Sequence, residues 1–178
     1  MRSLMSPAGV LANSVGTLTV PWLTERETAA LIVAVVSLLF YRAFREHYVL
    51  AWGTGWIAYG AFLFLSRAST SHPASPAMAA VTQADFVLAM GLFAAAALMS
   101  AQSRRALTAL IAVSWVWMVC AAMNPLYFPD SQSVRLGLQI GCRVIAAGAA
   151  IELLLSRWGR IGIGPWLFGA GLLTLNLN

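Results

Sequence analysis

The strongest constraint in this sequence is a succession of apolar segments, each about as long as a helix that crosses a bilayer, with short polar turns between them. About 20 apolar residues in a helix cover the hydrocarbon core of a membrane. Hydrophobic residues make up 60% of the 178 residues and charged residues only 10%, whereas a soluble domain carries about 25% charged residues. We therefore predict an all-α, polytopic integral membrane bundle of about six transmembrane helices, over residues 25–44, 48–66, 77–100, 106–123, 133–155 and 161–176.

Local signals set the ends of these segments. Residues 1–23 are diluted by Ser, Asn, Pro and Gly and lack the compact apolar region of a secretory signal. We interpret them as a retained tail outside the cytoplasm that precedes a single membrane domain over 24–178. Thr24 and Glu27 have the spacing of a capping box, which opens a helix. Residues 66–76, rich in Ser, Thr, Ala and Pro, are predicted to form a loop. The fourth segment is expected to stop at Asn124 and Pro125.

The arginines predict the orientation of the chain. All eleven cationic side chains are arginines. Apart from Arg143, which lies within the fifth span, they are scattered at segment ends and in the tail rather than gathered in the patch that a nucleic-acid partner would need. An excess of arginine marks the cytoplasmic side. With the N-terminus outside, the inner turns hold Arg42, Arg45, Arg104, Arg105, Arg157 and Arg160, and the outer side holds Arg2, Arg26, Arg67 and Arg135. We therefore predict an outside N-terminus. Six spans then return the C-terminus to the outside, so we expect a further span beyond Asn178.

Two ionisable residues lie deep within predicted spans. Asp85 and Arg143 would lie about 12 and 15 Å below the same membrane surface, at 1.5 Å per helical residue. Charge inside a membrane is costly and marks a functional hypothesis, so we predict that the two meet as an ion pair and form part of a ligand or proton site. The alternative is a structural pair that fixes the register of two helices. Glu152 lies near the inner end of the fifth span and is interpreted as an interfacial carboxylate.

An aromatic stripe marks the second span. Tyr48, Trp52, Trp56 and Tyr59 are spaced by four, four and three residues, which places them on one face of a helix. The functional hypothesis is a flat apolar site for a quinone, a lipid tail or a fatty-acid-like signal. The alternative is helix packing combined with anchoring at the membrane interface. The candidate ligand-binding residues are thus Asp85, Arg143, Tyr48, Trp52 and Trp56.

Other motifs are sparse. Gly137 and Gly141 form a GxxxG motif, which is compatible with a homodimer through close helix pairing. The sequence has no phosphate-binding glycine loop, no nucleophile elbow, no metal-ligand cluster and no paired catalytic carboxylates. No histidine lies within a predicted span to ligate a haem. We therefore predict no catalytic residues, no metal and no cofactor. The composition predicts the lipid bilayer as a partner.

Residues 41–60 carry a resemblance to a known group of proteins. Arg42, Arg45, Tyr48, Trp52, Gly55 and Trp56 follow the pattern of a basic turn that ends a first span and an aromatic, glycine-containing run that begins the second. This pattern is similar to the N-terminal multi-pass membrane region of bacterial signalling proteins, especially GGDEF-type diguanylate cyclases and sensor histidine kinases. The resemblance implies a sensory or signal-transducing input module in the bacterial cytoplasmic (inner) membrane, followed by a cytoplasmic output domain. No such output domain lies within these 178 residues.

Two rival functions stay open at this point. A small transporter would show repeated, broken helices near the middle of the membrane, and Gly162, Gly164 and Pro165 are the one candidate break. A lipid-modifying membrane enzyme would gather polar side chains near one surface, which only Glu152, the inner arginines and His47 approach.

Overall fold

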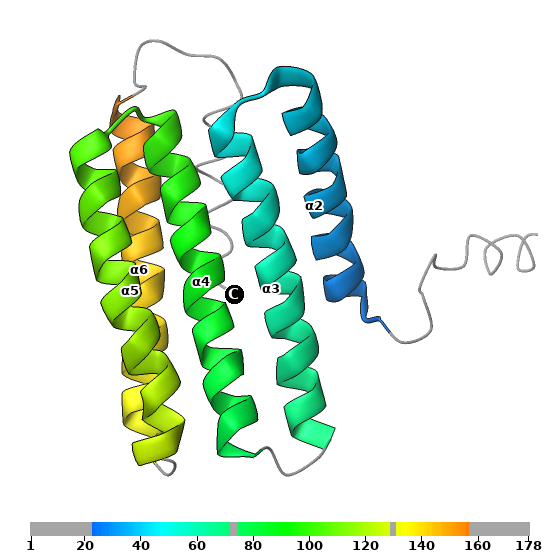
Figure 1. Cartoon of the computed structure of the whole chain (residues 1–178), viewed down its shortest axis with the longest axis vertical. Coiled ribbons are helices and arrows are strands. Elements are labelled where there is room, and N and C mark those ends of the chain that lie inside the picture. The colour runs from blue at the N-terminus through cyan, green and yellow to red at the C-terminus, as the bar shows by residue number, and fades with distance from the viewer. Residues whose placement is uncertain (1–22, 72–74, 129–130, 157–178) are drawn as a thin grey trace, which may run out of the picture.

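The computed structural model describes residues 23–71, 75–128 and 131–156, and within them it forms five helices that run alternately up and down (Figure 1). These are α2 (Glu25–Phe44), α3 (His47–Ser71), α4 (Pro76–Ser100), α5 (Arg104–Tyr127) and α6 (Gln132–Ser156). All five are long and apolar enough to cross a membrane. The predicted all-helical membrane bundle is confirmed for this part of the chain. The predicted tail and the sixth segment, over 161–176, fall outside the described residues.

The first helix begins and ends where the sequence signals place it. The Oγ1 of Thr24 accepts a bond from the backbone N–H of Glu27 (3.3 Å), and the Glu27 carboxylate accepts one from the backbone N–H of Thr24 (2.7 Å). These reciprocal bonds satisfy two donors that the first turn would otherwise leave free. The helix ends at Phe44 because Arg45 adopts a left-handed conformation with φ of 58°. The predicted range 25–44 is therefore confirmed.

Two helices run further than the sequence predicted. The α3 helix continues to Ser71 rather than ending at 66. In its last turns the Oγ of Ser69 donates to the carbonyl of Ser66 (2.7 Å), so this hydroxyl is satisfied within the helix. The α5 helix passes through Pro125 and ends at Tyr127 rather than at 123. Proline is tolerated in membrane helices when a neighbour satisfies the backbone group that it frees, and α4 supplies that neighbour.

The α4 helix lies at the centre of the bundle. It contacts α3, α5 and α6, while α2 contacts only α3 among the described helices and stands at the edge (Figure 1). Phe93, Ala94 and Ala97 of α4 are fully buried. Large apolar side chains cover the outer surface instead; Leu39, Val116 and Val144, for example, are more than 60% exposed. Large apolar side chains on the outer surface are expected of a protein that is surrounded by lipid.

The α2 and α3 helices pack closely through small side chains. Ala30, Ala34 and Ser37 of α2 are buried at a spacing of three to four residues. Opposite them, a Cβ built on Gly53 would lie 3.1 Å from Ser37 Cβ, and one on Gly60 would lie 3.6 Å from Ala30 Cβ. Small residues let helix backbones approach in a membrane, where dispersion contacts drive association.

An ion pair fastens the far end of the same two helices. Arg67 Nη1 of α3 lies 3.3 Å from Oε2 of Glu27, whose side chain is 2% exposed. Glu27 therefore serves two purposes, since the same carboxylate also caps α2. This explains how a charged residue is accommodated in a buried position.

Candidate functional site

The aromatic stripe of α3 surrounds one ring of α4. Trp52, Trp56 and Tyr59 place their ring centroids 4.9, 5.4 and 6.4 Å from that of Phe93. Trp56 also meets Trp52 and Tyr59 edge to face, at 5.9 and 5.8 Å. These separations are in the range preferred by interacting aromatic rings. We call Trp52, Trp56, Tyr59 and Phe93 the aromatic seam.

Gly55 makes the aromatic seam possible. A Cβ on Gly55 would lie 2.7 Å from Cε1 of Phe93, closer than real Cβ contacts allow. The missing side chain therefore lets the Phe93 ring lie against the backbone of α3, where it is fully buried. A second aromatic pair continues the interface, because Phe62 and Phe86 lie 5.0 Å apart.

One polar atom in the seam has no partner. The indole Nε1 of Trp56 is buried and makes no hydrogen bond. A buried donor left unpaired costs about 1–3 kcal/mol, and such exceptions call for an explanation. The predicted residues Trp52 and Trp56 thus come together in the seam. Tyr48 does not join them: it is half-buried at the start of α3 and makes no ring contact within the described part of the chain.

The predicted ion pair of Asp85 and Arg143 is not formed between these two described residues. The Oδ2 of Asp85 is buried and has no hydrogen-bond partner, although Arg143 lies on α6, which contacts α4. Rotation about α4 explains the difference. Val87 lines a small cavity with Cys142 of α6, and Asp85 lies about 160° around the helix from Val87. Asp85 shares its face with Leu92, which lies against Gly55 of α3.

A polar cluster that the sequence reasoning missed lies where α4, α5 and α6 meet. Gln83, Asn124 and Arg135 form it, and Asn124 is only 5% exposed. In one orientation of the Gln83 amide, its oxygen accepts from Asn124 Nδ2 at 3.3 Å. In the reversed orientation, its nitrogen donates to the carbonyl of Ala121 (3.0 Å) and its oxygen accepts from Arg135 Nε (3.3 Å). We favour the reversed orientation because it satisfies two groups rather than one.

Pro125 accounts for this cluster. A proline has no N–H, so the carbonyl four residues earlier, that of Ala121, loses its helical partner. The Gln83 amide takes that place from the neighbouring helix. The sequence signal for this cluster is the pair Asn124-Pro125 inside an apolar run. By itself this pair predicts the end of a span rather than a polar contact with another helix.

The two glycines of the GxxxG motif differ in their surroundings. A Cβ on Gly141 would collide with the ring of Trp117, whereas Gly137 is exposed and has nothing within 4 Å. The Nε1 of Trp117 donates to the carbonyl of Leu138 at 3.0 Å. Gly141 therefore allows α5 to pack on α6 within the chain. The homodimer stays a prediction, and of the two glycines only Gly137 lies where it could contact a second copy.

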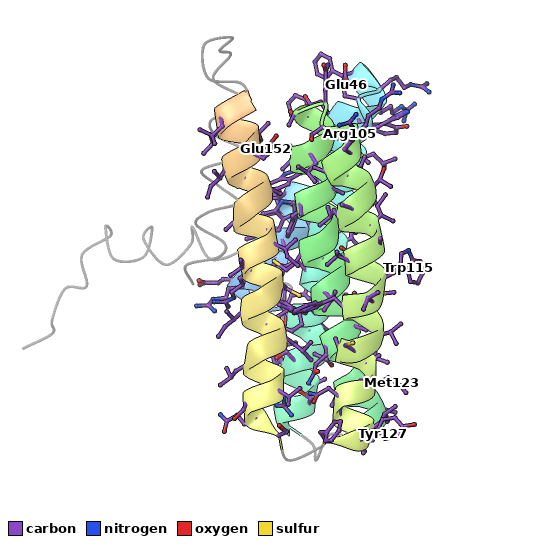
Figure 2. The ribbon with its side chains drawn as sticks, turned by 90° about the vertical axis from the view of Figure 1, so that its left-hand side faces the viewer. Glu46, Arg105, Trp115, Met123, Tyr127 and Glu152 are labelled. Atoms are coloured by element: carbon purple, nitrogen blue, oxygen red, sulfur yellow. The ribbon has the colours of Figure 1, made fainter. Side chains whose placement is uncertain are left out.

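Glu152 is the remaining ionisable candidate on a described helix. Glu152 is exposed near the end of the bundle that carries Glu46 and Arg105 (Figure 2). Within the described residues, no group of three or more His, Cys, Asp or Glu side chains is arranged to hold a metal ion. Comparison of the chain with protein-family models, with curated proteins and with solved structures gives no match.

Proposed function

We propose that this chain is a membrane-embedded sensory and signal-transducing module, the input part of a longer signalling protein in the bacterial cytoplasmic membrane, with its N-terminus outside. The observation that carries the proposal is the unpartnered Trp56 N–H in the aromatic seam. Asp85 adds a second unpartnered polar atom on the face of α4 toward α3. Intramembrane polar groups of this kind are costly and are commonly retained for function.

The chemistry of the seam favours one class among the ligands that the aromatic stripe suggests. Flat rings of Trp52, Trp56 and Phe93 suit a flat apolar ligand. The Trp56 N–H is a donor only, so it selects a ligand that offers an acceptor oxygen. A quinone has both properties, because its ring is planar and its carbonyl oxygens accept hydrogen bonds.

The packing of α2 supports a way to transmit the signal. The α2–α3 hairpin contacts the rest of the described bundle through the α3–α4 interface, because α2 contacts α3 alone. A ligand that enters the aromatic seam would bind one arrangement of this hairpin better than another. A difference in affinity between two arrangements is what allows a ligand to shift a conformational equilibrium.

Binding is tested with the full chain in lipid nanodiscs and a short-chain ubiquinone as the probe. We expect Trp56→Phe, which keeps the ring and removes the N–H, to weaken binding about fivefold, the effect of losing one hydrogen bond of about 1 kcal/mol. The matched control is Trp115→Phe, because Trp115 is 62% exposed on α5 and lies outside the seam. Equal affinities of the two variants would contradict the quinone site.

Transmission is tested separately by distance measurements between spin labels. Leu39 of α2 and Val116 of α5 are both exposed, at 61% and 63%, and accept labels as cysteine variants in a Cys120→Ser background, since Cys120 is exposed and Cys142 is buried. Saturating quinone is expected to shift the distance distribution between the two labels. Tight binding with an unchanged distribution would remove the signal-transducing part of the proposal.

A further inference from the structure

An apolar groove runs between α4 and α5 on the outer surface of the bundle. It encloses about 250 Å³. Its lining is almost entirely apolar, and it includes Leu88, Gly91 and Ala95 of α4 and Ile111, Ser114 and Trp115 of α5. No residue of the aromatic seam lines it, so it is independent of the proposed quinone site.

Two small residues, Gly91 and Ser114, line the groove where its two helices meet. A Cβ on Gly91 would lie 3.3 Å from the Oγ of Ser114, so the two helices approach closely at this level. Leu88 and Trp115 then stand on either side of the groove, 45% and 62% exposed. Figure 2 shows Trp115 pointing away from α5 toward the surroundings. The groove therefore opens toward lipid rather than toward the core.

A basic group stands in line with the groove at one end of the bundle. Arg104, Thr108, Ile111 and Trp115 are spaced by four, three and four residues, which places them along one face of α5. The Arg104 side chain is exposed, and Arg105 lies beside it. Because Arg104 is the first residue of α5, the free N–H groups and the positive dipole end of the helix add to its charge.

The spacing along α5 fits a lipid molecule. Arg104 lies seven residues before Ile111, and the lined part of α5 extends to Met118. At 1.5 Å per residue, the groove begins about 10 Å from Arg104 and ends about 20 Å from it. This is the order in which a phospholipid presents its phosphate and its acyl chain, measured from the membrane surface inward.

We propose that this groove binds one acyl chain of an anionic phospholipid whose phosphate is held by Arg104. The charge at this end of the bundle favours an anionic lipid over a second copy of the chain as the occupant of the groove. The same end of the bundle carries Arg42, Arg45 and Arg105 as further exposed cations, and the exposed carboxylates of Glu46 and Glu152 offset them only in part. The described residues at this end therefore carry a positive balance, which would repel the same end of a second, parallel copy. Anionic headgroups are attracted to basic residues at the membrane surface by about 1 kcal/mol for each residue.

Native mass spectrometry of the full chain tests the proposal. Phosphatidylglycerol and phosphatidylcholine with identical acyl chains are titrated against the detergent-solubilised protein. We expect tighter retention of phosphatidylglycerol, and a loss of about fivefold in its affinity for Arg104→Gln. The matched control is Arg42→Gln, which removes an exposed arginine at the same end of the bundle but on α2, away from the groove. Its affinity for phosphatidylglycerol should fall clearly less than that of Arg104→Gln.

A second variant separates the acyl chain from the headgroup. Ala95→Leu fills the groove and is expected to weaken retention of both lipids, whereas Arg104→Gln acts on phosphatidylglycerol alone. Equal retention of the two lipids by the wild type, or equal effects of Arg104→Gln and Arg42→Gln, would overturn the proposal. So would a stable dimer that Ala95→Leu converts to monomer, because the groove would then belong to a second copy. Retention of neither lipid would likewise overturn it.

Discussion

Gly55 is the residue whose replacement tests the aromatic seam most directly. In Gly55→Ala, the new Cβ would lie 2.7 Å from Cε1 and 2.8 Å from Cδ1 of Phe93, well inside the optimal carbon–carbon separation of about 3.5–4.0 Å. Phe93 is fully buried among three aromatic rings and has no space to yield. Overpacking of this kind costs about 1–3 kcal/mol, and alanine recovers up to about 1 kcal/mol as a better helix former. The difference is a net loss of up to about 2 kcal/mol in the free energy of unfolding.

Gly60 provides the matched control on the same helix. A Cβ there meets only Ala30 Cβ, at an ordinary contact distance of 3.6 Å. Gly60→Ala is therefore expected to leave stability unchanged or raise it by up to about 1 kcal/mol. The measurement is reversible unfolding in detergent micelles, followed by circular dichroism. Phe93→Leu, which removes Cε1, should reduce the cost of Gly55→Ala. The reasoning is refuted if the two glycine variants shift stability equally and in the same direction.

Three further variants probe the other polar and glycine contacts. Glu27→Ala removes a helix cap and an ion pair and should cost about 1–2 kcal/mol of unfolding free energy, with a smaller loss for Glu27→Gln; equal losses would mean that the cap contributes nothing. Gln83→Leu should cost about 1 kcal/mol of unfolding free energy. In a Pro125→Ala background it should cost almost nothing, because the new N–H at position 125 then bonds the carbonyl of Ala121. Additive effects in this double-mutant cycle would contradict the bond assigned between Gln83 and Ala121. Gly141→Ala should destabilise the monomer in the same unfolding assay, because its Cβ would collide with Trp117. Gly137→Ala should leave monomer stability unchanged or raise it by up to about 1 kcal/mol but lower the dimer fraction measured by light scattering. An unaffected dimer would remove the predicted homodimer interface.

The sequence predicts a helix end correctly where residues next to that end alone determine it. The capping bonds of Thr24 and Glu27 lie within four residues of one another, so the start of α2 could be predicted without knowing the rest of the fold. The helix end predicted at Pro125 is wrong because the effect of a proline is not local. A proline frees a carbonyl, and whether the helix stops depends on whether another helix can satisfy it. Gln83, 42 residues earlier, does so, and no pattern around Pro125 reveals this.

A count of residues from the end of a span predicts the depth of a side chain but not the rotation of its helix. Counting residues from the ends of two spans placed Asp85 and Arg143 at similar levels. Whether they meet also depends on how each helix is turned about its axis, which the contacts of Val87 and Leu92 decide. The aromatic stripe was found because its periodicity lies within one helix. Its partner Phe93 was not, since a lone aromatic residue in an apolar helix carries no periodic signal.

The central place of α4 has a consequence for assembly during synthesis. When α4 has just been inserted, α3 already covers one of its faces, and the hairpin of α2 and α3 can be complete. The face that α6 will cover carries Val87 and Met90 and must wait until some 30 to 60 more residues have left the ribosome. During that interval this face of α4, the most buried of the described helices, has lipid or an insertion factor as its neighbour. A nascent chain that stalls before α6 would therefore expose the α4 surface to wrong partners, and quality control in the membrane has its clearest target there.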